Sequence, residues 1–224
     1  MPATPPEAPA TRSTPVTDPT DWQRLPTADS IALRDPLAET LGMVRDEDPI
    51  VVTFPDVAKA AGHACPAVAG AYRVTQVALA SLYPDPARLP VRGEIAVRVG
   101  GSRDDHGVGP MASIVEHITG AADETGFAGL GGIGGRQDLL SFGSVDGPGP
   151  GRAFAFTRTD TDATVRVSFD PQAGGGMADL VPELVGQDRD ATDREDVLAE
   201  WHRRVQRVLD LDPSPDGPLV LERD

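Results

Sequence analysis

The longest amphipathic run in the middle of the chain predicts a helix from Ala67 to Tyr83. Apolar side chains recur there every three or four residues, the spacing of one helix face, and Pro84 ends the pattern. A proline directly after Cys65 suits the first helical position, where a missing N–H costs nothing. Cys65 is therefore expected at or next to the N-cap, where unpaired amides and the helix dipole favour a thiolate.

Alternating apolar and polar positions predict strands elsewhere in the chain. Residues 94–99 indicate a half-buried strand, and residues 152–158 and 164–169 indicate a β-hairpin. The β-branched run 50–54 predicts a strand or the lead into a helix. Further helices are expected at 36–41, 110–119 and 177–185, and after the capping box at 192–195. Together these elements predict an α+β fold, a mixed or antiparallel sheet covered by helices in a single domain.

Composition sets the expected limits of that domain and narrows the class of partner. Residues 1–20 are rich in proline and lack aromatic residues, so a disordered tail is expected there, followed by the domain over 21–212 and a C-terminal tail over 213–224. The net charge of −15 argues against nucleic acid and anionic membranes as partners. With one cysteine, no signal peptide and no apolar run long enough to span a membrane, a cytoplasmic protein is expected.

The sequence also suggests a metal site. Cys65 follows His63 by two residues, and His106 lies in a loop directly after the predicted strand at 94–99. One thiol cannot close a structural zinc site, but three protein ligands with an open fourth position are typical of a catalytic or transient site. We therefore expect one divalent metal ion on His63, Cys65 and His106, with zinc first and iron, nickel or copper as alternatives.

Four further residues are candidates to act on a small-molecule substrate beside this metal. Asp104 and Asp105 would support a ligating imidazole or act as a base toward bound water, or they are simple loop carboxylates. Tyr72 and Arg73 lie one to two turns after Cys65 and would reach a pocket at the helix mouth, or they are a packed tyrosine and a solvated arginine. The glycine-rich stretch 126–135 is expected to border the pocket. Its G-x-G-x-x-G match follows no strand and opens no long helix, which argues against dinucleotide binding.

Two other functions stay open at this point. Cys65 and His63 would also suit a metal-free nucleophilic enzyme, although no third group to orient the imidazole is apparent. A non-catalytic accessory protein that passes a metal or cofactor to a partner would need the same ligands.

The run from Gly62 to Arg73 resembles the G-H-x-C-P-G-x-x-x-G-Y-R signature of the FmdE family, proteins similar to one of the subunits of formylmethanofuran dehydrogenase. The resemblance covers about residues 48–211, and it continues through 105–108, 118–120, the glycine-rich turn before Leu139, 154–156 and 165–167. It implies a dimeric α+β protein with a Cys/His metal site, usually holding zinc, and hence a homodimer.

The chain also departs from the family pattern in three places. The family has a cysteine where this chain has His106, and it has Thr-Gly-Cys where this chain has Thr119-Gly120-Ala121. The cysteine-rich zinc-ribbon tail of many members is absent. A site with one thiol fewer and one imidazole more offers the metal a less soft set of ligands. This disfavours an iron–sulfur cluster or a redox dithiol.

Overall fold

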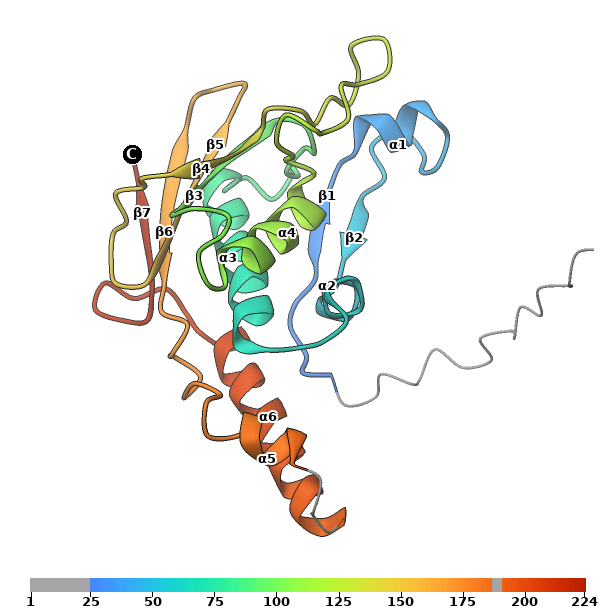
Figure 1. Ribbon diagram of the computed structural model, residues 1–224. Helices are drawn as coiled ribbons and strands as arrows, with labels where there is room; N and C mark the ends of the chain where they lie inside the picture. Colours follow the sequence, from blue (N-terminus) through green and yellow to red (C-terminus); the bar gives the residue numbers. More distant parts are fainter. Residues whose placement is uncertain (1–24, 187–190) are drawn as a thin grey trace, which may run out of the picture.

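A five-stranded mixed sheet is the frame on which the helices pack (Figure 1). The protein is described by a computed structural model that covers residues 25–186 and 191–224. Strand order across the sheet is β4-β3-β5-β6-β7, with β3 and β4 parallel and the other neighbours antiparallel. The strands are β3 (Ile95–Gly100), β4 (Leu140–Gly143), β5 (Arg152–Arg158), β6 (Thr164–Phe169) and β7 (Leu219–Arg223).

The hairpin of β5 and β6 forms the middle of this sheet and confirms the alternation seen in the sequence. Phe154 pairs with Val167 and Phe156 with Val165, and all four side chains are buried. Because side chains alternate between the two faces of a strand, these residues lie on the face that the helices cover. Burying a phenylalanine there stabilises the fold by about 1.5–3 kcal/mol relative to leaving it exposed.

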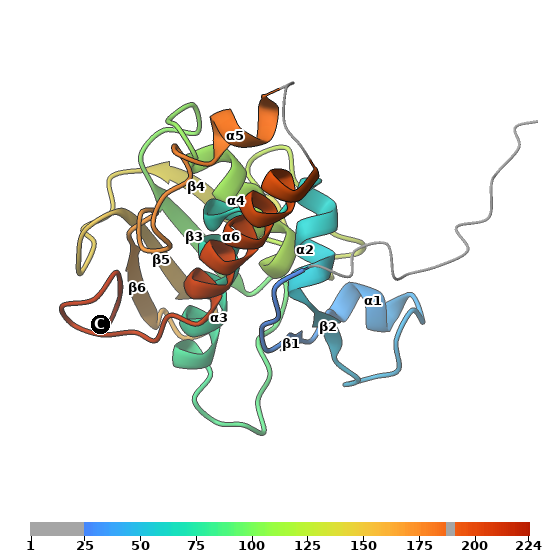
Figure 2. The same ribbon diagram turned by 90° about the horizontal axis from the view of Figure 1, so that it is seen from below.

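Helix α3 (Pro66–Leu82) lies at the centre of the molecule. It packs on β5, β6 and β7 and is itself contacted by other helices. Figures 1 and 2 show α6 running alongside it, and α4 also packs against it. Because it is covered on several sides, most of its residues are buried and its sequence is rich in alanine and valine. The other helices are α1 (Pro36–Thr40), α2 (Phe54–Ala61), α4 (Val108–Thr119), α5 (Val181–Val185) and α6 (Ala191–Leu209).

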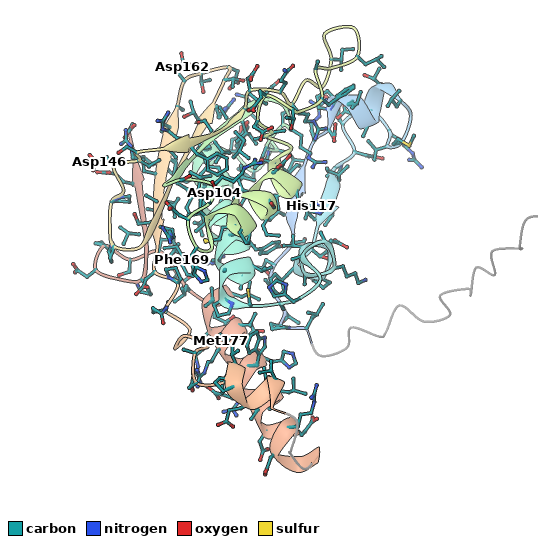
Figure 3. The ribbon with its side chains drawn as sticks, in the orientation of Figure 1. Asp104, His117, Asp146, Asp162, Phe169 and Met177 are labelled. Carbon is teal, nitrogen blue, oxygen red and sulfur yellow. The ribbon has the colours of Figure 1, made fainter. Side chains whose placement is uncertain are left out.

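A glycine fixes how closely α3 approaches the sheet. A Cβ at Gly70 would lie 2.1 Å from Cε1 of Phe169, the last residue of β6, whose side chain is fully buried. Figure 3 shows Phe169 between the end of β6 and α3. The first turns of α3 are thereby held against the end of the sheet at which β6 finishes and β5 begins.

A smaller sheet and a buried carboxylate join the N-terminal part of the domain to the rest. Strands β1 (Ile31–Leu33) and β2 (Ile50–Val52) pair antiparallel. Asp35 then caps α1 and accepts hydrogen bonds from Arg136 at 2.8 Å and Arg92 at 3.3 Å. Burial alone would raise the pKa of Asp35, but Arg136, the Ala38 amide and Arg92 outweigh it and hold that pKa below its ordinary value.

The expected single α+β domain is confirmed, with several boundaries corrected. The segment 213–224, expected as a tail, contributes β7 to the sheet, so the domain extends past residue 212. Helix α4 begins at Val108 rather than at 110, and α5 covers only the end of the expected helix at 177–185. Strands β1 and β4 were not expected. The predicted tail at 1–20 and the side chain of Thr192 in the predicted capping box lie outside what the structure describes.

Within the described ranges, none of the helices combines the length and the apolar character needed to cross a bilayer.

Candidate metal-binding corner

Cys65 is the N-cap of α3, as the proline after it predicts. Its backbone is extended (φ −143°, ψ 170°), Pro66 opens the helix, and the Ala69 amide donates to the Cys65 carbonyl at 2.9 Å. The thiol caps none of the helix amides and is only partly buried. It is therefore available to a ligand at the positive end of a 17-residue helix.

The His63 ring is held in one orientation by its own backbone. Gly62 closes α2 with a left-handed conformation (φ +75°) that carries the chain back toward α3. After this turn, Nδ1 of His63 lies 3.0 Å from the Ala61 carbonyl. A carbonyl only accepts, so Nδ1 carries the proton and the neutral ring has its lone pair on Nε2. No partner of Nε2 occurs among residues 25–186 and 191–224. Metal-ligating histidines have this arrangement, in which one ring nitrogen donates to a carbonyl and the other is left for the metal.

Trp201 of α6 anchors the short connection between these two residues. Its Nε1–H donates to the Ala64 carbonyl at 2.7 Å, which ties residue 64 to a helix far along the chain. The His63–Cys65 segment is thus fixed at three points, by α2, by α3 and by α6. Trp201 was not predicted as part of the site, because its apolar spacing marked it only as part of a helix face.

The loop between β3 and α4 carries the other predicted residues. The Asp105 carboxylate accepts from the Ser102 amide at 2.8 Å, so it stabilises the turn of its own loop. Asp104 and His106 are exposed, and the His106 carbonyl accepts from Nη2 of Arg152 at 2.8 Å. Figure 3 shows Asp104 in this loop and His117 toward the far end of α4. Asp105 is therefore a turn residue in this arrangement, and the Asp104 side chain faces solvent.

Three successive contacts connect the His63–Cys65 segment to the His106 loop. Gly70, five residues after Cys65, lies against Phe169, and Phe169 pairs with Arg152 across the sheet. Arg152 in turn donates to the carbonyl of His106. Both segments therefore belong to the same end of the fold. Even so, nowhere in the described chain do three His, Cys, Asp or Glu side chains come together in a group that could hold a metal ion. Of the three expected ligands, His63 and Cys65 lie two residues apart on one connection, and His106 lies on a separate loop.

Tyr72 lies in the core and not in a pocket at the helix mouth, which corrects the expectation from sequence. Its side chain is fully buried and packs edge-on against Phe54 with ring centroids 5.6 Å apart. Its hydroxyl lies 2.8 Å from the Asp29 carbonyl and 3.1 Å from the Val52 carbonyl, either of which accepts its proton. Burial, with the charges of Asp56 and Asp29, raises the pKa of Tyr72 to about 12.

Arg73 also has a structural role that the sequence did not predict. Its Nε donates to the Leu211 carbonyl at 2.7 Å, and its Nη2 pairs with Asp212 at 3.1 Å. It thereby fastens α3 to the segment that follows α6. Arg73 does line a hollow of about 410 Å³, but the other lining residues come from the N-terminal segment, Gln76 of α3 and the end of α6, and the set does not include His63, Cys65 or His106.

The glycine-rich stretch lies at the opposite end of α3, so it does not border the His63–Cys65 segment. Within it, Leu130 and Ile133 pair as a short bridge. Gly134 of this stretch packs closely on Leu37, since a Cβ at Gly134 would lie 2.5 Å from the Leu37 side chain. Gly135 packs closely on Gly93, since a Cβ at Gly93 would lie 2.8 Å from the Gly135 carbonyl. Since Gly93 follows the C-terminal end of α3, this loop packs far from the N-cap. The expectation that this stretch borders a pocket beside His63 and Cys65 was therefore wrong.

A shallow hollow does lie beside the His106 loop. It has a volume of about 400 Å³ and is lined by Gly100, Gly101, Gly143, Ser144, Val145, Gly151, Arg152 and Ala153. Arg152 was not predicted from the sequence, because nothing in an alternating strand distinguishes a guanidinium that reaches the carbonyl of a distant loop. Neither the family models nor the curated proteins include a match to this chain.

Proposed function

We propose that the chain binds one divalent metal ion through Nε2 of His63 and the thiolate of Cys65, with His106 as the third ligand and one position left for a small molecule. The observation that carries the proposal is the hydrogen bond from His63 Nδ1 to the Ala61 carbonyl at 3.0 Å. It leaves Nε2 as an acceptor with no partner in the described part of the chain, on a residue two positions before a thiol. One thiolate with imidazole nitrogens suits zinc best among the common divalent ions.

The backbone that carries the first two ligands is already fixed, whereas the loop that carries the third has to move. The His63–Cys65 segment is held by α2, α3 and Trp201, so its backbone has no need to move. His106 has to be carried in by its loop. That loop is bounded by Gly101 and Gly107, both at positive φ (+105° and +80°), and the His106 ring itself is exposed. The proposal therefore predicts that metal binding shifts the backbone of residues 101–107.

Bound at this position, a divalent metal would supply Lewis acidity for polarising a carbonyl or activating water. The chain's own groups would position the ligand beside it. Arg152 holds the His106 loop through the carbonyl of His106, and the hollow next to Arg152 is large enough for a small molecule. Tyr72 and Arg73 have no part in this proposal, because both are engaged elsewhere.

A second candidate is a non-catalytic accessory protein that hands its metal to a partner. The exposed ring of His63 favours it, since a site that exchanges metal with another protein must be open to contact. Membership of the FmdE family and the homodimer that it implies also stay predictions, and the elution volume of the purified protein tests the latter.

The test is metal content per chain, measured by inductively coupled plasma mass spectrometry after loading with zinc and desalting. We expect about one zinc in the native protein, little in Cys65→Ser and His63→Ala, and weaker retention in His106→Ala. His117→Ala is the matched control, because His117 is an exposed histidine at the far end of α4, and it should retain the metal. A metal-free protein whose Cys65 is readily alkylated would overturn the proposal and favour the nucleophile.

A further inference from the structure

A segment without regular structure, 144–151, passes over the end of the sheet and forms one wall of the hollow beside His106. Two of its glycines allow the close approach. A Cβ at Gly147 would lie 2.5 Å from Oγ of Ser168, and one at Gly149 would lie 2.5 Å from Val220. The Gly149 amide also donates to Oγ of Ser168 at 3.2 Å. The opposite wall is the paired ends of β3 and β4, which are glycines as well, so backbone rather than side chains surrounds the space.

Arg152 is the charged residue that lines this hollow, and no salt bridge neutralises it. Its Nη2 donates to the His106 carbonyl, and no carboxylate in residues 25–186 and 191–224 pairs with its guanidinium. This differs from Arg34, Arg158 and Arg204, each of which pairs with a carboxylate. Asp146, the acidic residue of the covering segment, is exposed and points away from the body of the molecule (Figure 3).

Backbone donors add to this positive charge. Ser144 and Val145 line the same hollow, and their amides donate no hydrogen bond to any acceptor in the described part of the chain. Unbonded amides and a guanidinium from residues that line one hollow form a combination that binds anions. The planar fork of an arginine matches a carboxylate. In a chain of net charge −15, a dianion such as phosphate is repelled more strongly than a monoanion.

We infer that this hollow binds the carboxylate group of a small organic acid, with the guanidinium of Arg152 and the amides of Ser144 and Val145 as donors. The inference rests on the proposed function only for the role of that acid as the small molecule next to the metal. Binding of the carboxylate itself does not require metal. The acid would lie beside the loop that carries His106, since Arg152 contacts both.

The test is a titration of metal-free, nitrogen-15-labelled full-length protein with propionate, followed by amide chemical shifts. Propionate should shift the amides of Ser144, Val145 and Arg152 saturably, and the neutral isostere propionamide should not. Arg152→Gln should weaken propionate binding about tenfold or more, the cost of losing a charged hydrogen bond. Arg152→Lys, which keeps the charge without the fork, should weaken it less. Arg88→Gln removes the charge of an exposed arginine elsewhere and should leave the affinity unchanged.

Three results would overturn the inference: equal responses to propionate and propionamide, tighter binding of inorganic phosphate than of propionate, or unchanged propionate affinity in Arg152→Gln with a native amide spectrum. Because the protein is free of metal, a failure here is separate from a failure of the zinc measurement. A Cys65→Ser protein that loses zinc and still binds propionate would support the carboxylate site on its own.

Discussion

The approach of Gly70 to Phe169 gives a sharp prediction for Gly70→Ala. In an ordinary helix this change stabilises by about 1 kcal/mol, because alanine loses less backbone entropy than glycine. Here the new methyl would lie 2.1, 2.5 and 2.7 Å from Cε1, Cζ and Cδ1 of Phe169. Restoring a contact of about 3.6 Å requires a shift of about 1.5 Å between α3 and a fully buried ring. Such overpacking costs about 1–3 kcal/mol and can cost more where neighbours are rigid.

Set against the helix gain of about 1 kcal/mol, this cost leaves an expected net loss of up to about 2 kcal/mol, with a fall in Tm of up to about 8 °C for a chain of this size. Urea denaturation monitored by circular dichroism measures the free energy of unfolding, and calorimetry measures Tm. The double variant Gly70→Ala/Phe169→Leu is the control, because the smaller side chain relieves the collision and should recover part of the loss. A Gly70→Ala protein at least as stable as the native one would refute the reasoning, since only the helix gain would then operate.

Three further predictions follow from named contacts. Asp35→Asn keeps the helix cap but leaves Arg92 and Arg136 without their carboxylate, so it should cost about 3 kcal/mol at pH 7 in urea denaturation. Because the pKa of Asp35 is lowered in the folded state, that difference should shrink as the pH falls below about 4, the ordinary pKa of the group, whereas a constant difference would contradict the charge argument. Tyr72→Phe should cost about 1 kcal/mol and leave zinc content unchanged; loss of zinc without loss of stability would restore Tyr72 to the site. Trp201→Phe should also cost about 1 kcal/mol of stability, because it removes the hydrogen bond to the Ala64 carbonyl. It should weaken zinc retention as well, since Ala64 lies between the two ligands, and unchanged retention would argue against Trp201 as an anchor of the site.

The parts of the fold that the sequence predicted are those governed by local pattern. Helix α3 follows from its apolar spacing and its flanking prolines, and the β5–β6 hairpin follows from two alternating runs joined by a short turn. Strands β4 and β7 were missed because each is short and lies after a glycine- or proline-rich stretch. Their place in the sheet depends on pairing with partners far along the chain, which no local window contains.

The candidate site divides in the same way. The N-cap position of Cys65 is a local consequence of Pro66, and the hydrogen bond of His63 is made to a carbonyl two residues away. The contacts of Trp201 with Ala64 and of Arg152 with His106 join residues 137 and 46 positions apart, so no spacing rule could identify them. Tyr72 was proposed for catalysis although its position on the apolar face already indicated the core.

The central claim is that one thiolate and at least one imidazole of this chain bind a divalent metal ion. Titration with cobalt(II), followed by absorption spectroscopy, tests it most directly, because a bond between cobalt and a thiolate gives a charge-transfer band in the near ultraviolet. We predict that this band saturates at about one cobalt per chain, is absent in Cys65→Ser, is diminished in His63→Ala and is unchanged in His117→Ala. A spectrum in which cobalt remains hydrated at every ratio, or a band that persists in Cys65→Ser, would contradict the account.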